Sequence, residues 1–245
     1  MMIKKIYIIF LFLAVHFHVG AELLLKDNLK KAEPGDFLVT AQNKNYTVLL
    51  IRSKDADYLS VEEITVPSSK ISNSPSFSWR KWVGQGAPGN SCWLLYYIHL
   101  PTGAIQQTYS FSRRELVVVP QSQNFLSTLL NLHLNLIPEK ERKKVGPPPP
   151  SDSLDRRAFW QPKLISEGKV VPGVTFDGWR THWPKDGSEL SDRTIEIFLP
   201  RDSTKYPSYF PYWLQINGML GKAKVRIVDS GKNLYSPNQD VKKEL

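Results

Sequence analysis

The chain has 245 residues and a formal net charge of +9, from 32 Lys and Arg residues against 23 Asp and Glu residues. A chain of this length can bury a core without disulfide bonds, and its single cysteine excludes an intramolecular disulfide. The basic excess is spread over both halves, so it predicts no specific nucleic-acid partner; it serves solubility or favours anionic surfaces without specificity.

The first 21 residues have the three-part pattern of a secretory signal peptide. Lys4 and Lys5 precede an apolar stretch over residues 6–17, and Val19-Gly20-Ala21 supplies the small residues that signal peptidase recognises. An uncleaved membrane anchor is the alternative, but a spanning helix needs roughly 20 apolar residues and this run is shorter. We therefore predict an exported protein, either in the periplasm or cell envelope of a Gram-negative host or otherwise secreted, with no transmembrane segment after cleavage.

Residues 22–145 show the two-residue periodicity of β-strands, with turn residues between the runs. Two hairpins are predicted, with strands at 37–40 and 46–52 and at 93–100 and 104–111. Cys92 lies at the start of one of these strands, where we expect a buried, inert thiol rather than a reactive one. Residues 123–137 carry apolar side chains at helical spacing, and Pro138 follows them, so they are predicted as the one substantial helix.

Four successive prolines, Pro147 to Pro150, mark a Pro-rich linker over residues 146–153, because such a run favours an extended, semi-rigid segment. The linker separates an N-terminal β-rich domain, 22–145, from a C-terminal β-rich domain, 154–245. Further strands are predicted at 194–199, 212–216 and 222–228. The pattern predicts a mainly β protein of two small antiparallel units, sandwich-like or barrel-like, with one helix before the linker.

The two halves share a short pattern of aromatic and basic residues. Phe77-Ser78-Trp79-Arg80-Lys81-Trp82 resembles Phe176-Asp177-Gly178-Trp179-Arg180-Thr181-His182-Trp183, and a strand that ends in Leu-Pro follows each segment. Either an internal duplication or a chance coincidence explains the pattern.

These two segments supply the candidate binding residues. An indole beside a guanidinium offers both contact area and directed donors, which suits flat contacts with sugars, peptides or lipid headgroups. The alternative is that the rings pack the core with the cations over them. We predict contacts with a protein or glycan of the cell envelope, or with an anionic surface, through Trp79, Arg80, Trp82, Trp179, Arg180, His182 and Trp183.

Signals for catalysis are weak. The sequence has no Gly-x-Ser-x-Gly motif, phosphate-binding loop or dinucleotide fingerprint. His182 lies near Asp177, Asp186, Glu189 and Asp192, but metal sites prefer several ligands at tight spacing. We predict no metal and no cofactor, and a non-enzymatic binding or envelope-associated protein. The alternative is a secreted hydrolase of an envelope polymer, centred on His182 and these carboxylates.

Three segments of the second half carry a family resemblance: Trp183–Leu190, Phe210–Ile216 and Gly221–Arg226. They are similar to uncharacterised exported proteins of chlamydia-like intracellular bacteria, mainly over residues 160–232. The resemblance implies a Gram-negative host and a periplasmic or envelope location. It implies no activity and supplies no catalytic residues.

Overall fold

The computed structural model describes residues 21–72, 74–118, 125–151, 153–218 and 221–238. The predicted signal peptide, apart from Ala21, lies outside these residues. Strands account for 43% and helices for 11%, which confirms the mainly β class. No helix in the described ranges has the length and apolar character needed to cross a membrane.

The elements are mostly strands, with three short α-helices and short 3-10 turns in the described residues. The helices and turns are α1 (Leu25–Leu29), α2 (Trp79–Gly84), α3 (Phe125–Leu130), η1 (Ser68–Lys70) and η3 (Glu139–Glu141). The strands of the first half are β1 (Glu22–Leu24), β2 (Phe37–Gln42), β3 (Asn45–Lys54), β4 (Tyr58–Pro67), β5 (Cys92–His99), β6 (Ala104–Ser110), β7 (Glu115–Val117) and β8 (His133–Leu136). Those of the second half are β9 (Leu164–Ser166), β10 (Lys169–Val171), β11 (Phe176–His182), β12 (Thr194–Pro200), β13 (Trp213–Gly218) and β14 (Gly221–Gly231).

Twelve of the described strands form one antiparallel sheet in the order β1-β8-β11-β12-β13-β14-β2-β3-β4-β5-β6-β7, while β9 and β10 form a separate hairpin. Strand β14 pairs with both β13 and β2, so the sheet continues from the second half into the first. Strand β8, from the first half, pairs with β11 of the second. The strands expected in two sandwich-like or barrel-like units therefore form one continuous open sheet.

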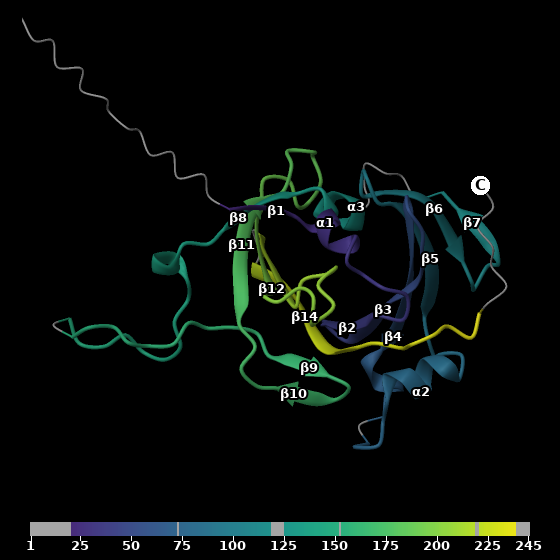
Figure 1. Ribbon diagram of the computed structural model, residues 1–245, viewed down its shortest axis with the longest axis horizontal. Coiled ribbons are helices and arrows are strands. Elements are labelled where there is room, and N and C mark those ends of the chain that lie inside the picture. The colour runs from purple at the N-terminus through teal and green to yellow at the C-terminus, as the bar shows by residue number, and fades with distance from the viewer. Residues whose placement is uncertain (1–20, 73, 119–124, 152, 219–220, 239–245) are drawn as a thin grey trace, which may run out of the picture.

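The sheet curls, and α1 and α3 lie between its β8–β11 side and its β5–β6 side (Figure 1). Leu25 and Leu29 of α1 and Leu129 and Leu130 of α3 are buried in a core that includes residues of both halves, such as Ile195. We call the surface of the sheet that faces this core the concave face. The burial of these apolar side chains stabilises the packing of α1 and α3 against the concave face.

The opposite, convex face carries a second core beneath α2. Trp79, Trp82 and Val83 recur at helical spacing, so they form one buried face of α2. Along β3, Leu49 belongs to the concave core and Val48 to the convex core. Strand β3 is thus buried on both faces, which explains its nearly continuous apolar run.

The predicted helix over residues 123–137 is wrong in its second half. Helix α3 ends at Leu130, and His133–Leu136 is strand β8, while residues 123 and 124 lie outside the described part. Leu134 is buried between exposed His133 and Asn135, which is the alternation of a strand. The apolar spacing fits both structures, and pairing of β8 with β1 and β11 selects the strand.

Other predicted elements are confirmed. The two hairpins are β2–β3 and β5–β6, and the three C-terminal strands are β12, β13 and β14. The Pro-rich residues belong to a long loop between β8 and β9 that folds back on its own base. There Lys143 O accepts from Trp160 N at 2.7 Å, and Asp155 forms ion pairs with Lys144 and Arg157.

Candidate functional site

The structure places the predicted binding residues in two separate locations. Trp79, Arg80 and Trp82 lie on α2, whereas Trp179, Arg180 and His182 lie on β11, with Trp183 immediately after it. One segment is therefore a helix and the other a strand, so the shared sequence pattern is not a repeated structure. Arg80 is exposed and donates to Glu167 and to the carbonyl oxygen of Lys232.

Three of the four indoles are buried: Trp79, Trp82 and Trp183 are at most 8% exposed. The Trp183 ring stacks on Phe125 with a centroid separation of 5.4 Å, and its Nε1 donates to Asp186 at 2.9 Å. Trp179 is partly buried and packs against the concave core. This burial favours the alternative interpretation, in which the rings pack the core.

The surroundings of His182 do not form an acid–base pair. His182 is exposed, and in the described part of the chain its hydrogen bond is to Thr194 Oγ1 at 3.4 Å, with none to a carboxylate. Asp177 pairs with Arg201, while hydrogen bonds from Ser188 and Trp183 hold the pKa of Asp186 below its usual value. Asp192 lies 3.8 Å from Lys185, so three of the four carboxylates that the sequence places near His182 have other partners.

A groove on the convex face of β11–β14 gathers a different set of residues. It lies between these strands and the loop that follows β8, and its volume is about 430 Å³. Of the seven predicted binding residues, it contains Arg180. Its lining residues are Ile137, Glu141, Arg142, Lys143, Trp160, Arg180, Glu196, Phe198, Trp213, Gln215, Lys222 and Lys224. We call it the convex groove.

Strand register builds the convex groove from two rows of side chains that cross the sheet. The first row, in which each residue pairs with the next, is Arg180, Glu196, Gln215 and Lys224. The second row is Gly178, Phe198 and Trp213. The residues between them along the strands, such as Ile197 and Leu214, point to the opposite face of the sheet and are buried in the concave core. Phe198 is itself buried, and together with Trp160 and Trp213 it is continuous with that core, so the aromatic side of the groove is firmly packed.

Gly178 leaves room for the aromatic cluster. A Cβ atom at this position would lie 3.1 Å from Phe198 Cε1 and 3.3 Å from Ile137 Cδ1, closer than ordinary contact. The Trp160 ring lies 4.9 Å from the Trp213 ring and 5.2 Å from the Phe198 ring, both in edge-to-face arrangements. Such aromatic pairs hold one another in fixed orientations.

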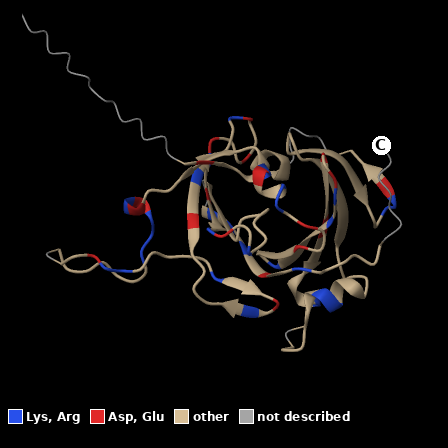
Figure 2. Ribbon diagram, in the orientation of Figure 1, with Lys and Arg blue, Asp and Glu red and all other residues tan. Residues whose placement is uncertain are grey.

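Positive charge exceeds negative charge in the groove. Arg180 is paired with Glu196 at 2.9 Å and with Glu141 at 2.7 Å. Lys143, Lys222 and Lys224 form no ion pair with any residue that the structure describes, so their charge is available to a ligand. Basic positions in the loop between η3 and β9 appear in blue in Figure 2.

Two of these lysines lie beside the aromatic cluster. Lys143 Nζ is 5.9 Å from the centre of the Trp160 ring, and Lys224 Nζ is 5.6 Å from that of the Trp213 ring. The groove can therefore contact the flat face of a ligand and an acidic group beside it. Within the described residues, no group of three His, Cys, Asp or Glu side chains is placed to hold a metal ion.

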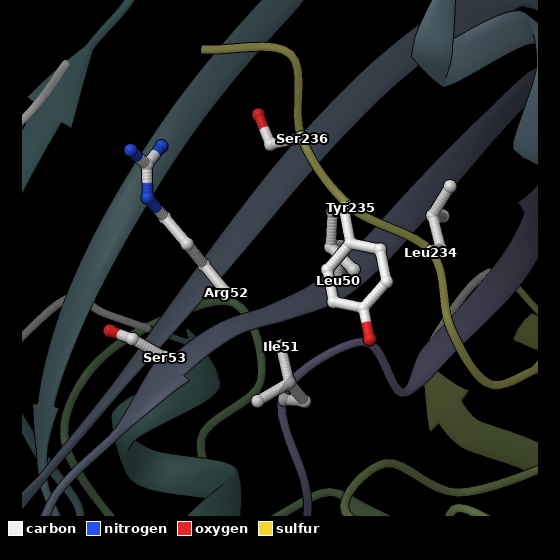
Figure 3. A pocket seen from close by; sticks show the side chains of 7 residues that line it. All are labelled: Leu50, Ile51, Arg52, Ser53, Leu234, Tyr235 and Ser236. Carbon is white, nitrogen blue, oxygen red and sulfur yellow. The ribbon is translucent and has the colours of Figure 1, made fainter. Parts of the chain in front are cut away.

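A smaller pocket, of about 260 Å³, lies between β3 and the segment Leu234–Ser236 (Figure 3). The most polar side chain in it is Arg52, whose Nη1 donates to Glu62 at 2.7 Å. Glu62 is fully buried and also accepts from Trp93 Nε1. Arg52 therefore neutralises a buried carboxylate, which gives it a structural role.

Cys92 begins β5, as the sequence predicts, and is partly buried. Burial, with a smaller contribution from the nearby Glu63 carboxylate, raises the pKa of the Cys92 thiol. A raised pKa lowers the fraction of thiolate, which is the reactive form. This agrees with the expectation of an inert thiol.

Fold and groove together define a class: a mainly β protein with one curled, open sheet and a basic, aromatic groove on its convex face. The chain belongs to the family described as CT021 protein, whose family model matches residues 47–172. The expected relation to uncharacterised chlamydial proteins is therefore confirmed. The matched region overlaps only the start of residues 160–232, where the resemblance was placed.

A solved structure of the hypothetical protein CT021 from Chlamydia trachomatis has a similar fold, with a TM-score of 0.61 and 18% sequence identity. The match covers 91% of this chain and 98% of that chain. At this identity the likeness concerns the fold alone. A comparison with curated proteins gave no match.

Proposed function

We propose that the protein is exported and acts, without a catalytic centre, as a binding protein that holds an anionic ligand of the cell envelope in the convex groove. The observation that carries this proposal is the set of unpaired lysines beside an aromatic cluster. Lys143 and Lys224 lie beside the Trp160 and Trp213 rings, and Lys222 lines the same groove. The basic net charge of the chain favours the same kind of partner.

The arrangement is suited to binding because its parts are fixed in advance. The cross-strand rows set the spacing of Gln215 and Lys224, and edge-to-face contacts fix Trp160 and Trp213. A site that needs little ordering when it binds retains more of its interaction free energy. The ion pair between Arg180 and Glu141 also ties the loop after β8 to the sheet.

Sedimentation with isolated Gram-negative cell envelopes tests this function. The purified protein is expected to co-sediment, and the double variant Lys222→Gln, Lys224→Gln to bind about tenfold more weakly, at roughly 0.7 kcal/mol for each lost contact. Added salt should weaken the binding, because the contacts are ionic and exposed.

The matched control is Lys169→Gln with Lys205→Gln, which removes the same charge from exposed positions outside the groove. Lys205 is a close control for Lys224, because it lies over the Tyr206 ring at 5.5 Å. Equal loss of binding in both double variants, or no binding by the natural protein, would contradict the proposal.

A further inference from the structure

We infer, building on the proposed binding function, that the ligand of the convex groove is an acidic polysaccharide: a sugar chain that bears acidic groups. Three features of the groove carry this choice. They are its position on the sheet, its aromatic rings, and the pairing of an amide with a carboxylate.

The groove lies on the face of strands that already have neighbours on both sides. Strand β11 lies between β8 and β12, and β14 lies between β13 and β2. An extended peptide that binds by adding a strand needs a free edge, where its backbone can form hydrogen bonds. A peptide in this groove would contact side chains only, and its own amide groups would lose water without equal replacement.

The aromatic cluster suits the faces of sugar rings. Trp160 and Trp213 are partly buried and both line the groove, so each presents part of a flat, rigid surface. The electron-rich face of an indole attracts the positively polarised C–H groups of a sugar ring, and the contact also removes apolar area from water. Lys224, beside Trp213, would then meet an acidic group on the same sugar.

The centre of the groove can hydrogen-bond hydroxyl groups. Glu196 and Gln215 are directly paired across β12 and β13. Arg180 Nε and Nη2 both approach Oε1 of Glu196, so among the described contacts its Oε2 remains an acceptor without a partner. The Gln215 amide donates one N–H to Asn217 Oδ1 at 3.2 Å, which orients it. Its second N–H can donate to a sugar hydroxyl and its oxygen can accept from one.

A lipid headgroup surface fits less well. The rings and the Glu196–Gln215 pair lie on a recessed surface between the sheet and the loop after β8, with Ile137 and Arg142 on the loop side. A flat bilayer would meet the exposed lysines at the rim without reaching the rings. A chain of sugars is narrow enough to enter.

Titration with defined polymers tests the inference, with the change in tryptophan fluorescence as the signal, because Trp160 and Trp213 are two of the seven tryptophans and line the groove. The probes are hyaluronan, which carries carboxylates, dextran sulfate, which carries sulfates, neutral dextran, poly-L-glutamate and phosphatidylglycerol vesicles. We expect at least one acidic polysaccharide to bind about tenfold more tightly than dextran and poly-L-glutamate. The better of hyaluronan and dextran sulfate identifies the acidic group that the groove prefers.

Two variants connect binding to the groove. Lys222→Gln with Lys224→Gln should weaken polysaccharide binding about tenfold, whereas Lys169→Gln with Lys205→Gln should leave it unchanged. Gln215→Ala should weaken polysaccharide binding about fivefold, because hydroxyl contacts are lost. The same change should leave the weak binding of poly-L-glutamate unaltered.

Several results would overturn the inference, and they separate it from the proposed function. Groove-dependent binding that is strongest for poly-L-glutamate or for vesicles would leave the function standing and exclude a polysaccharide. Envelope binding that needs Lys222 and Lys224, with no binding of either acidic polysaccharide, would do the same. Polysaccharide binding that is insensitive to both groove variants would overturn the inference and the function together.

Discussion

At the scale of single residues, Glu63 is a partly buried carboxyl group in an apolar setting. Its neighbours along β4 on the same face, Leu59 and Val61, belong to the concave core, as does Tyr96. Burial raises the pKa of Glu63, and a hydrogen bond with Tyr96 offsets only part of that rise. The folded state therefore favours the protonated form.

This makes a prediction about the pH dependence of stability. The pKa of Glu63 is higher in the folded than in the unfolded state. The stability that its protonated form contributes is therefore fully present below the unfolded-state pKa of about 4.3, and it is lost as pH rises through the folded-state pKa. Glu63→Gln should therefore gain stability relative to the natural protein between pH 4 and pH 7.5, as measured by urea unfolding. A difference that does not change with pH would contradict this, and exposed Glu189→Gln is the control.

Trp183 tests whether the buried indoles are structural. Trp183→Ala should destabilise the protein by about 3–5 kcal/mol, because it leaves a cavity in the core and removes the ring that stacks on Phe125. The neighbouring exposed residue gives the control, since His182→Ala should change stability by no more than about 0.5 kcal/mol. Thermal and urea unfolding measure both. Unchanged stability of the Trp183 variant would show that the ring is not needed for folding.

The sequence indicates which residue types matter but not which of them are accessible. Tryptophans beside basic residues signal contact surfaces and packed cores equally well, and only tertiary structure separates the two. Arg180 was the one groove residue singled out in advance. Lys222 and Lys224 alternate along β14 and so could be predicted to share a face. Lys222 and Lys224 line the same groove as Trp160 only because the loop after β8 folds back over the sheet. No local sequence pattern predicts the path of this loop.

At the scale of elements, strand hairpins were the most predictable part of the fold. Asn43, between β2 and β3, and Gly103, between β5 and β6, both have positive φ angles, which the Asn and Gly of these turns tolerate. Alternating apolar residues on each side then fix the strands. Such signals are local, so the sequence carries them without reference to the rest of the molecule.

Elements selected by distant partners were predicted less well. The segment that forms β8 has apolar residues compatible with a helix, and it becomes a strand because β1 and β11 lie on its two sides. In the same way, the two segments that share a Trp-Arg pattern become α2 and β11. Trp79, Trp82 and Val83 bury one helical face, whereas Gly178 on β11 faces Phe198 across the sheet. Tertiary contacts thus outweigh local pattern at these positions.

At the scale of the whole molecule, the two halves of the chain share one sheet and one concave core. Residues 22–145 supply strands at both outer parts of the sheet, and the second half supplies the four strands between β8 and β2. The main core includes buried residues from both halves. The Pro-rich segment separates the halves in sequence, although their strands are hydrogen-bonded to each other.

This arrangement predicts that the first half is not stable alone. Residues 22–145, expressed without the second half, lack the partners of β2 and β8 and would expose apolar residues of the concave core. We expect no cooperative unfolding transition for this fragment, measured by circular dichroism against urea concentration, and a clear transition for residues 22–245. A cooperative transition in the fragment would show that it is an independent domain.

Strand β14 also has a consequence for the order of events during synthesis. It is the latest described strand in chain order, yet it lies between β13 and β2 and joins the two parts of the sheet. While the ribosome is still making the second half, the edge of β2 has no neighbour, and open edges of this kind attract other chains. The nascent chain must therefore wait, incompletely folded, until almost its whole length has emerged. We propose that the chain is exported, and this delay would leave it unfolded enough to pass through a translocation channel. A chaperone that binds the unfolded chain would prevent aggregation until β14 has been synthesised.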